Sequence, residues 1–422
     1  MNDIFGANDV SADDPTEWQG LMVDALAHRA MGNTLAAVQA YRQALAAAER
    51  HAAGYPDDPG AQFTAASGCD VLSAALEALG DEAGAVKAAR TGLRLLERLV
   101  ARDPSNETYR RQLALAQLRI ADAQWEHGDT RAIYQAYEAL RETAMRLLAA
   151  DPGNSEYRAF VWRAEDTIGR ARCDEKGGEA AVADFARALS IAENTAPQCP
   201  DDEDWQDRLA TSHEHLGISF AMMDRFSDAL NEHATARRIR QQLASGESHT
   251  PQRHQALAEN CTTAGDICLA AQNPDEALRL YRKALGAYRQ AQTRDPDDAL
   301  IAIHLCVTQQ RIGDALAEQG HRQKALRTFR DALDGLQRLA RLLPEDPYTR
   351  GKILVCYCRL AEVTEPFDPA EARRWCQQGR DALSRMQQAG TPACPTDGRR
   401  LLELAERLGI EPPPPAAPDA QA

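Results

Sequence analysis

The chain has few aromatic residues and no long apolar segment. Aromatic side chains make up 5% of its 422 residues. Since β-strands favour aromatic and β-branched residues, a fold built mainly of sheet is not expected. No apolar run is long enough to span a bilayer. The acidic segment MNDIFGANDVSADDP at residues 1–15 has no hydrophobic stretch, so it does not fit a signal peptide.

The chain also lacks basic charge, patterned cysteines and catalytic motifs. The formal net charge is −15 and the sequence pI is about 5.2. Such a surface repels phosphate backbones, so nucleic acid is not an expected partner. The ten cysteines have no regular spacing, which is typical of reduced thiols in a cytoplasmic protein. The sequence has no nucleophile elbow, phosphate-binding glycine loop or Ser-His-Asp order. We therefore expect a cytoplasmic protein that is not an enzyme and binds no cofactor and no membrane.

What the sequence does contain is a repeat of 48 residues. The segment AGDICLAAQNPDEALRLYRKAL, residues 264–285, aligns without a gap to IGDALAEQGHRQKALRTFRDAL, residues 312–333. Gly265 then corresponds to Gly313, and Tyr281 corresponds to Phe329. Small residues and prolines recur at this period along nearly the whole chain, with one-residue slips near Ala132 and Ala372. About eight units result, which is enough for a stacked array to bury a continuous core.

Each unit has the pattern of two amphipathic helices. In one unit Trp205, Leu209 and His213 follow at spacings of four residues, which places them on one face of a helix. Asn273-Pro274 has the residues of a helix N-terminus, with asparagine as the cap and proline in the first turn. Gly265, Ala277 and Ala284 are small, so we expect the two helices of a unit to approach closely there. The segment Ala244–Thr250 lacks the usual boundary proline and is expected to be a proteolytic weak point.

These residues resemble the tetratricopeptide repeat. The order Ala264-Gly265, Ala277, Tyr281 and Ala284 has that family's internal spacings, although its usual repeat is 34 residues long. The resemblance implies an all-α, right-handed α-solenoid (superhelix) of about eight helix-turn-helix repeats, in a longer-helix variant common in bacteria. We expect a disordered leader at 1–15, the solenoid at 16–392, a capping helix at 393–409 and a proline-rich disordered tail at 410–422.

For function, the resemblance implies a scaffold that binds a protein or peptide in a concave groove. Our leading hypothesis adds that the scaffold regulates a separate effector or signalling protein. The alternative is a sensor that binds a small ligand or short peptide and changes the shape of the superhelix. In the family, the first helix of each unit lines the groove. On the matching face the candidate groove acids are Asp122, Glu126, Asp166, Glu214, Glu259, Asp266, Asp314, Glu318 and Glu362, and Asp70 and Glu77 extend the set.

Only Arg163 and Arg170 are identified as basic counterparts of these acids. The sequence therefore favours a partner with a basic segment, since complementary charge speeds association and selects partners. A solvated face in an already acidic protein is the competing interpretation.

Two other clusters allow a metal site or a simple packing role. Cys356 and Cys358 form a CxC pair, with Cys376 and Cys394 downstream. In a helix, residues two apart point in nearly opposite directions, so we expect Cys356 to be buried and the pair not to chelate a metal. His213 and His215 lie two apart, whereas the helical zinc motif needs a spacing of four. We interpret His213 as a core histidine.

Overall fold

The computed structural model describes residues 17–127, 130–246, 250–344, 346–388, 390 and 395–410. Over these ranges the chain forms seventeen α-helices and one 3-10 helix, with no strand. The chain divides into two compact units, Met1–Cys199 (unit 1) and Pro200–Ala422 (unit 2). Each unit is described below by itself.

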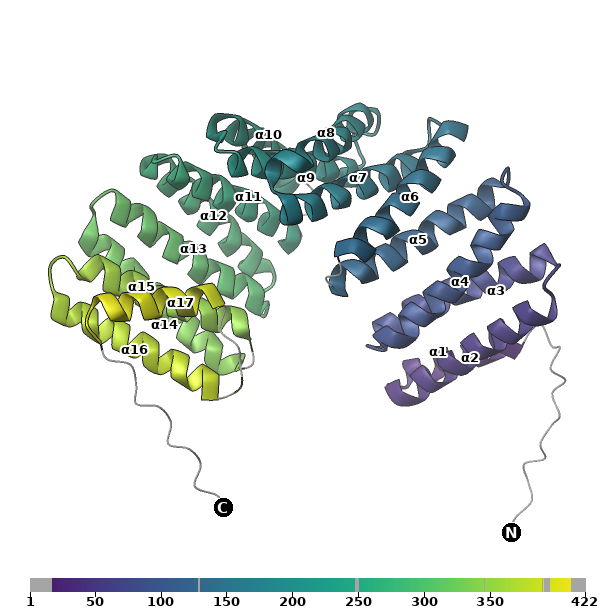
Figure 1. The fold of residues 1–422 in the computed structure, drawn as a ribbon, viewed down its shortest axis with the longest axis horizontal. Helices are drawn as coiled ribbons and strands as arrows, with labels where there is room; N and C mark the ends of the chain where they lie inside the picture. Colours follow the sequence, from purple (N-terminus) through teal and green to yellow (C-terminus); the bar gives the residue numbers. More distant parts are fainter. Residues whose placement is uncertain are drawn as a thin grey trace, which may run out of the picture. The chain divides into compact units, whose positions relative to one another are not determined.

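Every helix pair of unit 1 has the same plan. Its helices are α1 (Glu17–Ala30), α2 (Thr34–Gly54), α3 (Pro59–Ala78), α4 (Glu82–Arg102), α5 (Glu107–His127), α6 (Thr130–Ala150), α7 (Ser155–Lys176) and α8 (Gly178–Thr195), followed by the 3-10 helix η1 (Ala196–Gln198). Odd-numbered helices are the first helices of the predicted units and even-numbered helices are the second. Within unit 1, each second helix packs against its own first helix, and α2, α4 and α6 also pack against the next first helix (Figure 1).

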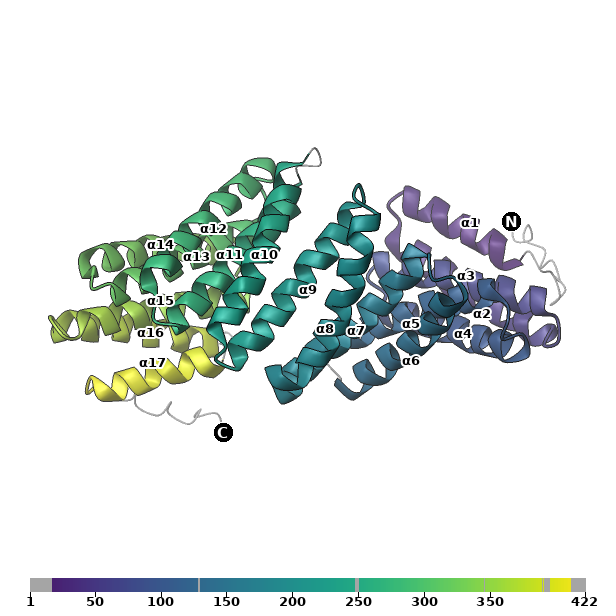
Figure 2. The same ribbon diagram turned by 90° about the horizontal axis from the view of Figure 1, so that it is seen from above.

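Unit 2 continues this plan and ends in an additional helix. Its helices are α9 (Glu203–Met222), α10 (Phe226–Ser245), α11 (Pro251–Ala270), α12 (Pro274–Arg294), α13 (Ala299–Glu318), α14 (Arg322–Leu342), α15 (Pro347–Thr364), α16 (Pro369–Gln388) and α17 (Pro395–Arg407). Figure 2 shows α10 to α14 stacked in chain order from a second direction. The eight helix pairs of the two units confirm the all-α repeat solenoid expected from the sequence.

A column of buried rings explains the repeat pattern. A small residue on the first helix is followed 16 residues later by a ring on the second helix, as in Gly265 and Tyr281. The other pairs are Ala25 and Tyr41, Ala121 and Tyr137, Gly169 and Phe185, Gly217 and His233, and Gly313 and Phe329; all six rings are buried. A methyl group placed on Gly313 would lie 2.5 Å from the Phe329 ring. Glycine is therefore required there by the close approach of the ring.

The turn between the two helices of a unit contains one residue with positive φ. Gly32, Gly80 and Gly320 have φ between 75° and 78°, at intervals that are multiples of 48 residues. The same position holds Asp224 and Gln272, each with φ 57°. Because a side chain makes this left-handed conformation unfavourable, the turns at Asp224 and Gln272 are less stable than the turns that have glycine.

The predicted helix signals agree with the structure. The Asn273 side chain accepts a hydrogen bond from the Glu276 backbone N–H at 3.2 Å, which caps α12. Helix α17 packs against α15 and α16, and buries Leu401 and Leu404 in the core of unit 2 (Figure 1). It therefore covers the exposed side of the last pair, as a capping repeat must.

Three predictions concern residues outside the described ranges. These are the disordered leader at 1–15, the proline-rich tail beyond residue 410 and the middle of the Ala244–Thr250 segment, at residues 247–249. All three stay predictions. Among the described helices none has both the length and the hydropathy needed to cross a membrane.

Candidate functional site

The predicted groove acids lie on the first helices, where several of them bind the following first helix. In unit 2, Asp266 on α11 pairs with Arg311 on α13. The next acid along, Asp314 on α13, pairs with Arg359 on α15 at 2.8 Å. At the end of the array Glu362 on α15 accepts from Arg400 on α17 at 2.8 Å. Acid on one first helix and arginine on the next thus form a regular series.

Unit 1 contains the same series. Asp70 on α3 pairs with Arg119 on α5 at 2.9 Å, and Asp122 on α5 pairs with Arg163 on α7 at 3.0 Å. We call these five contacts the inter-repeat pairs. They correct the expectation that Arg163 and Arg170 are the only basic counterparts. The Arg170 guanidinium lies over the Trp125 ring, 4.2 Å from its centroid.

Burial and ion pairing have opposite effects on these acids. The Tyr281 hydroxyl donates to Asp266 at 2.7 Å, so this carboxylate binds both a ring of the column and Arg311. Burial nevertheless raises the pKa of Asp266, and it raises the pKa of Asp314 to about 6 against the lowering effect of nearby arginines. These carboxylates are thus structural groups held between helices.

Glu214 is also bound within the array. Its carboxylate accepts from the buried Arg240 side chain at 2.9 Å and from Asn260 on α11 at 3.0 Å. Arg240 also binds Asp207 and the Thr211 hydroxyl. A buried guanidinium with this many acceptors fixes the packing of α10 on α9.

The remaining predicted acids differ in their exposure. Asp166 is only 2% exposed, so it is not part of an open face. The side chain of Glu126 lies outside the described residues. Glu259 and Glu318 are exposed and have no ion pair within the part of the chain that the structure describes. Surrounding protein and the nearby Glu214 carboxylate raise the pKa of Glu259. These two glutamates are the predicted acids most open to a partner.

A pocket of about 290 Å³ opens between α3, α4 and α5. Its rim carries the carboxylates of Asp70, Glu77, Glu82 and Asp122 against the single guanidinium of Arg119. The apolar part of its wall is formed by Ala85, Val86, Ala89, Leu115, Leu118 and Ile120. Because two first helices flank a second helix here, the pocket opens on the same side as the inter-repeat pairs. We call it the acid-rimmed pocket.

The pocket exists because one ring of the column is missing. At the position of Tyr281 and Phe329, this unit has Ala89, and the small residue that faces it is Ser73. The Ser73 hydroxyl donates to the Ala85 carbonyl at 2.9 Å instead of meeting a ring. Sequence reasoning missed this site, although the break in the ring series at Ala89 was a visible signal.

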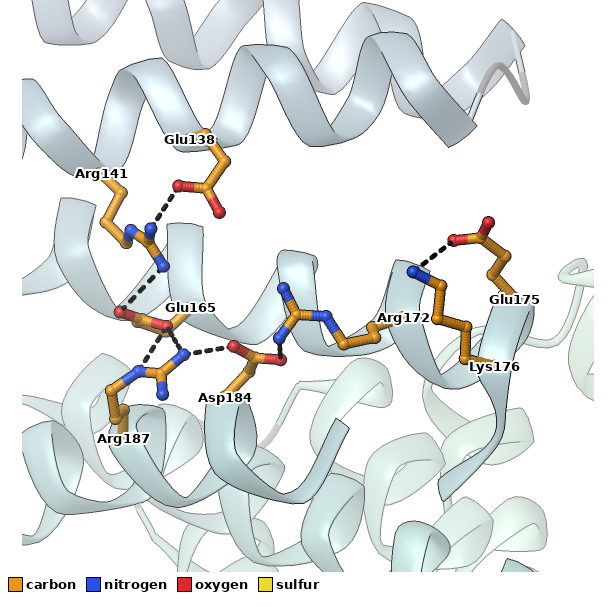
Figure 3. Close-up of polar contacts among 8 residues, drawn as sticks. All are labelled: Glu138, Arg141, Glu165, Arg172, Glu175, Lys176, Asp184 and Arg187. Carbon is orange, nitrogen blue, oxygen red and sulfur yellow. Dashed lines mark hydrogen bonds and ion pairs between the residues drawn. The ribbon is translucent and has the colours of Figure 1, made fainter. Parts of the chain in front are cut away.

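A second polar cluster, which the sequence did not suggest, is buried between α6, α7 and α8. Asp184 is fully buried and binds both Arg172 and Arg187 (Figure 3). Arg187 also donates to Glu165 at 2.9 Å, and Arg141 of α6 lies 3.8 Å from the same carboxylate. Such a network joins three helices and favours a single packing arrangement, since breaking it would leave buried charge unpaired.

The cysteine and histidine clusters pack in the core. Cys356 is buried as predicted, but Cys358 is buried as well, because α15 is covered on both sides once α17 is in place. Cys394 lies outside the described residues. The His213 ring contacts Glu232 at 2.6 Å and is buried, in agreement with a core histidine. Within the described ranges, no three His, Cys, Asp or Glu side chains gather closely enough to hold a metal.

Comparison with known proteins gives structural matches only. BtubC from P. vanneervenii is 17% identical with a TM-score of 0.47, over 62% of this chain and 91% of BtubC. The apo form of RapI is 15% identical with a TM-score of 0.45, over 77% of this chain and 99% of RapI. A signal transduction ATPase with a tetratricopeptide repeat sensor, from Pyrococcus horikoshii, is 12% identical with a TM-score of 0.46, over 89% of this chain and 50% of that protein. No family model and no curated protein matches the chain. Likeness at this level carries no information on ligand or partner.

Proposed function

Because the chain is an array of tetratricopeptide-type helix pairs, we propose that it is a non-enzymatic scaffold that binds a protein or peptide on the first-helix face. The observation that carries this proposal is the acid-rimmed pocket between α3, α4 and α5. Its apolar wall and its excess of carboxylates over the single Arg119 suit a lysine or arginine side chain, whose aliphatic stem packs while its charged end meets the rim. Asp70, Glu77 and Asp122 already have arginine partners. The exposed Glu82 is therefore the rim carboxylate most available to the ligand. The partner would then present a basic side chain next to an apolar one.

Unit 2 has exposed acids on its own first helices. Glu259 and Glu318 have no ion pair among the described residues and are available to additional basic side chains. Each exposed ion pair contributes about 0–1 kcal/mol, so several must act together. The acids of the inter-repeat pairs serve mainly to hold the first helices together. Regulation of a separate effector and residence in the cytoplasm belong to the same proposal.

The proposal is tested by screening a displayed peptide library against the full chain. We expect enrichment of peptides with Lys or Arg beside an apolar residue, and affinity that falls as salt rises past about 0.15 M. Ala89→Phe would restore the missing ring and fill the pocket, so it should weaken binding at least tenfold. Glu77→Gln and Glu82→Gln, both on the rim, should slow association.

The control is Glu193→Gln, which removes one exposed acid from the second helix α8, outside the pocket and outside the first-helix face. Denaturant midpoints of all variants would show that the fold is retained. If selected peptides are neutral or acidic, or if Ala89→Phe binds them like the wild type, the proposed site is wrong.

A further inference from the structure

A second type of pocket lies in unit 2. Between α14, α15 and α16 it has a volume of about 550 Å³. Here two second helices flank a first helix, so the pocket opens on the second-helix side and not on the side of the inter-repeat pairs. On α15, Ile353 and Tyr357 line this pocket, whereas Arg359 and Glu362 occupy the other face of the helix. We call it the outer pocket.

The outer pocket is lined by cations in an acidic protein. Arg341, Arg350 and Arg385 come from three different helices, and no carboxylate of the described residues lines it. This is unexpected in a chain with 63 acidic and 48 basic residues. None of the three arginines has an ion pair within the described ranges. Three guanidinium groups around one space repel one another, unless an anion lies between them.

Arg350 shows most clearly that a partner is missing. One of its terminal nitrogens, Nη1, is buried and has no hydrogen-bond partner. The residue lies in the first turn of α15, where the helix dipole disfavours positive charge. Against the raising effect of burial, hydrogen bonds from the first turn of α15 and the charge of Arg350 lower the pKa of the Asp346 carboxylate. This carboxylate is used as the N-cap, since it accepts from the backbone N–H groups of Tyr348 and Thr349. A buried guanidinium nitrogen is normally satisfied, so this position calls for an external acceptor.

The repeat architecture produces the same pocket elsewhere. Between α10, α11 and α12 a pocket of about 320 Å³ is lined by equivalent residues. Gln241, Ala244, His254, Leu257 and Cys261 lie 96 residues, or two repeat lengths, before Gln337, Ala340, Arg350, Ile353 and Tyr357. That pocket also contains cations, Arg237 and Lys283, and no lining carboxylate among the described residues. A pocket at this position is thus a property of the repeat fold. The three arginines distinguish the outer pocket from the equivalent pocket between α10, α11 and α12.

We propose that the outer pocket binds a small organic oxyanion that carries at least two phosphate or carboxylate groups. Arginine is suited to both groups, because its planar fork donates two parallel hydrogen bonds to them. The Tyr357 ring, Ile353 and Met386 provide an apolar surface for the body of the ligand. The volume lies within the range of small-molecule sites. The site goes beyond the proposed scaffold function, because its face and its charge are the opposite of those of the acid-rimmed pocket.

Calorimetric titration of the full chain with inorganic pyrophosphate, and separately with citrate, at fixed ionic strength tests the proposal. We expect saturable binding of at least one probe, and the tighter one identifies the preferred group. The double variant Arg350→Gln, Arg385→Gln should lower the affinity at least tenfold. The matched control is Arg327→Gln, because Arg327 is an exposed arginine of α14 outside the pocket.

Hydrogen exchange keeps the proposal testable if the double variant does not fold. In the wild type, the bound probe should protect backbone amides at residues 347–357, and protection confined to other helices would overturn the proposal. Unchanged affinity in the double variant would also overturn it, as would the absence of binding by either probe. An octaglutamate peptide that binds at least tenfold more tightly than both probes, and is lost in the double variant, would show that the pocket takes an acidic polypeptide instead.

Discussion

The imidazole of His233 occupies a position that holds a tyrosine or phenylalanine ring in most other repeats. It is buried against Gly217, and burial lowers its pKa to about 4. The Glu214 carboxylate opposes this shift, while Arg237 and His215 add to it. A histidine in the ring column therefore packs like an aromatic residue only while it is neutral, and it makes the stability of unit 2 depend on pH.

The contribution of His233 to stability should fall as the pH is lowered from about 6.5 towards 4, whereas Asp314, whose pKa is raised to about 6, contributes in the opposite direction. In this window the unfolded chain binds a proton at His233 that the folded chain does not, which lowers the free energy of unfolding by about 3 kcal/mol in total. His233→Phe should remove this contribution, so that stability at low pH relative to neutral pH is higher than in the wild type, measured by denaturant unfolding at several pH values. His321→Gln, at an exposed histidine, is the control. A profile equally steep in His233→Phe would contradict the assignment.

The backbone conformation of Gln272 also lowers the stability of the folded chain. It is exposed and adopts φ 57° at the turn position where other units have glycine. Gln272→Gly should stabilise the protein by about 0.5–1 kcal/mol, because glycine avoids the left-handed penalty but loses more entropy on folding. Gln272→Ala, which keeps a Cβ at the same φ, should give no comparable gain. Denaturant midpoints at constant slope decide between the two, and a destabilised glycine variant would refute the argument.

At the scale of the helix pair, the ring column sets how closely two helices approach. Gly313→Ala should destabilise by about 1–3 kcal/mol, because the added methyl group meets the Phe329 ring. Gly286→Ala is the matched control, since this exposed helical glycine has open space around its Cα. It should instead stabilise by about 0.5–1 kcal/mol through helix propensity. If Gly313→Ala and Gly286→Ala shift the unfolding midpoint in the same direction, contact with the Phe329 ring does not determine the effect at Gly313.

Helix pairs and their close contacts could be predicted from the sequence, because both leave a periodic signal. Gly265, Ala277 and Tyr281 recur at fixed spacing, and the cap at Asn273 follows from local chemistry. The candidate site could be predicted only in part. Whether Asp266 is free or bound depends on Arg311, 45 residues away on another helix, and no local rule gives that distance.

Features that arise from a missing group leave no recurring pattern in the sequence. The acid-rimmed pocket results from a ring that is missing at Ala89, and the outer pocket results from charges that lack partners. Both depend on what surrounds a residue in space. Cys358 is a similar case, because its burial depends on α17, which begins 37 residues further along the chain at Pro395.

For the whole molecule, the division at Cys199 and Pro200 has a measurable consequence. Repeats contact mainly their neighbours, so four pairs with a capping helix have what a stable array requires. We expect a fragment of residues 200–422 to fold alone, with helical circular dichroism and a cooperative thermal transition. A fragment of residues 224–422 lacks α9 and leaves the His233 ring uncovered, so it should melt at lower temperature. If the longer fragment is unfolded, unit 2 is not an independent folding unit.

The inter-repeat pairs also bear on how such a chain could have evolved. Each pair has its acid on the earlier first helix and its arginine on the later one, and the arginines Arg311 and Arg359 both stand three residues before the next acid. Loss of residues 290–337, one full period, would bring Asp266 opposite Arg359, so that both charges of the remaining pair would keep a partner. Duplication of the same 48 residues would add one further pair of the same kind. Unequal recombination within α11 to α15 can therefore change the number of repeats in one step and still keep this charge pair at the new junction.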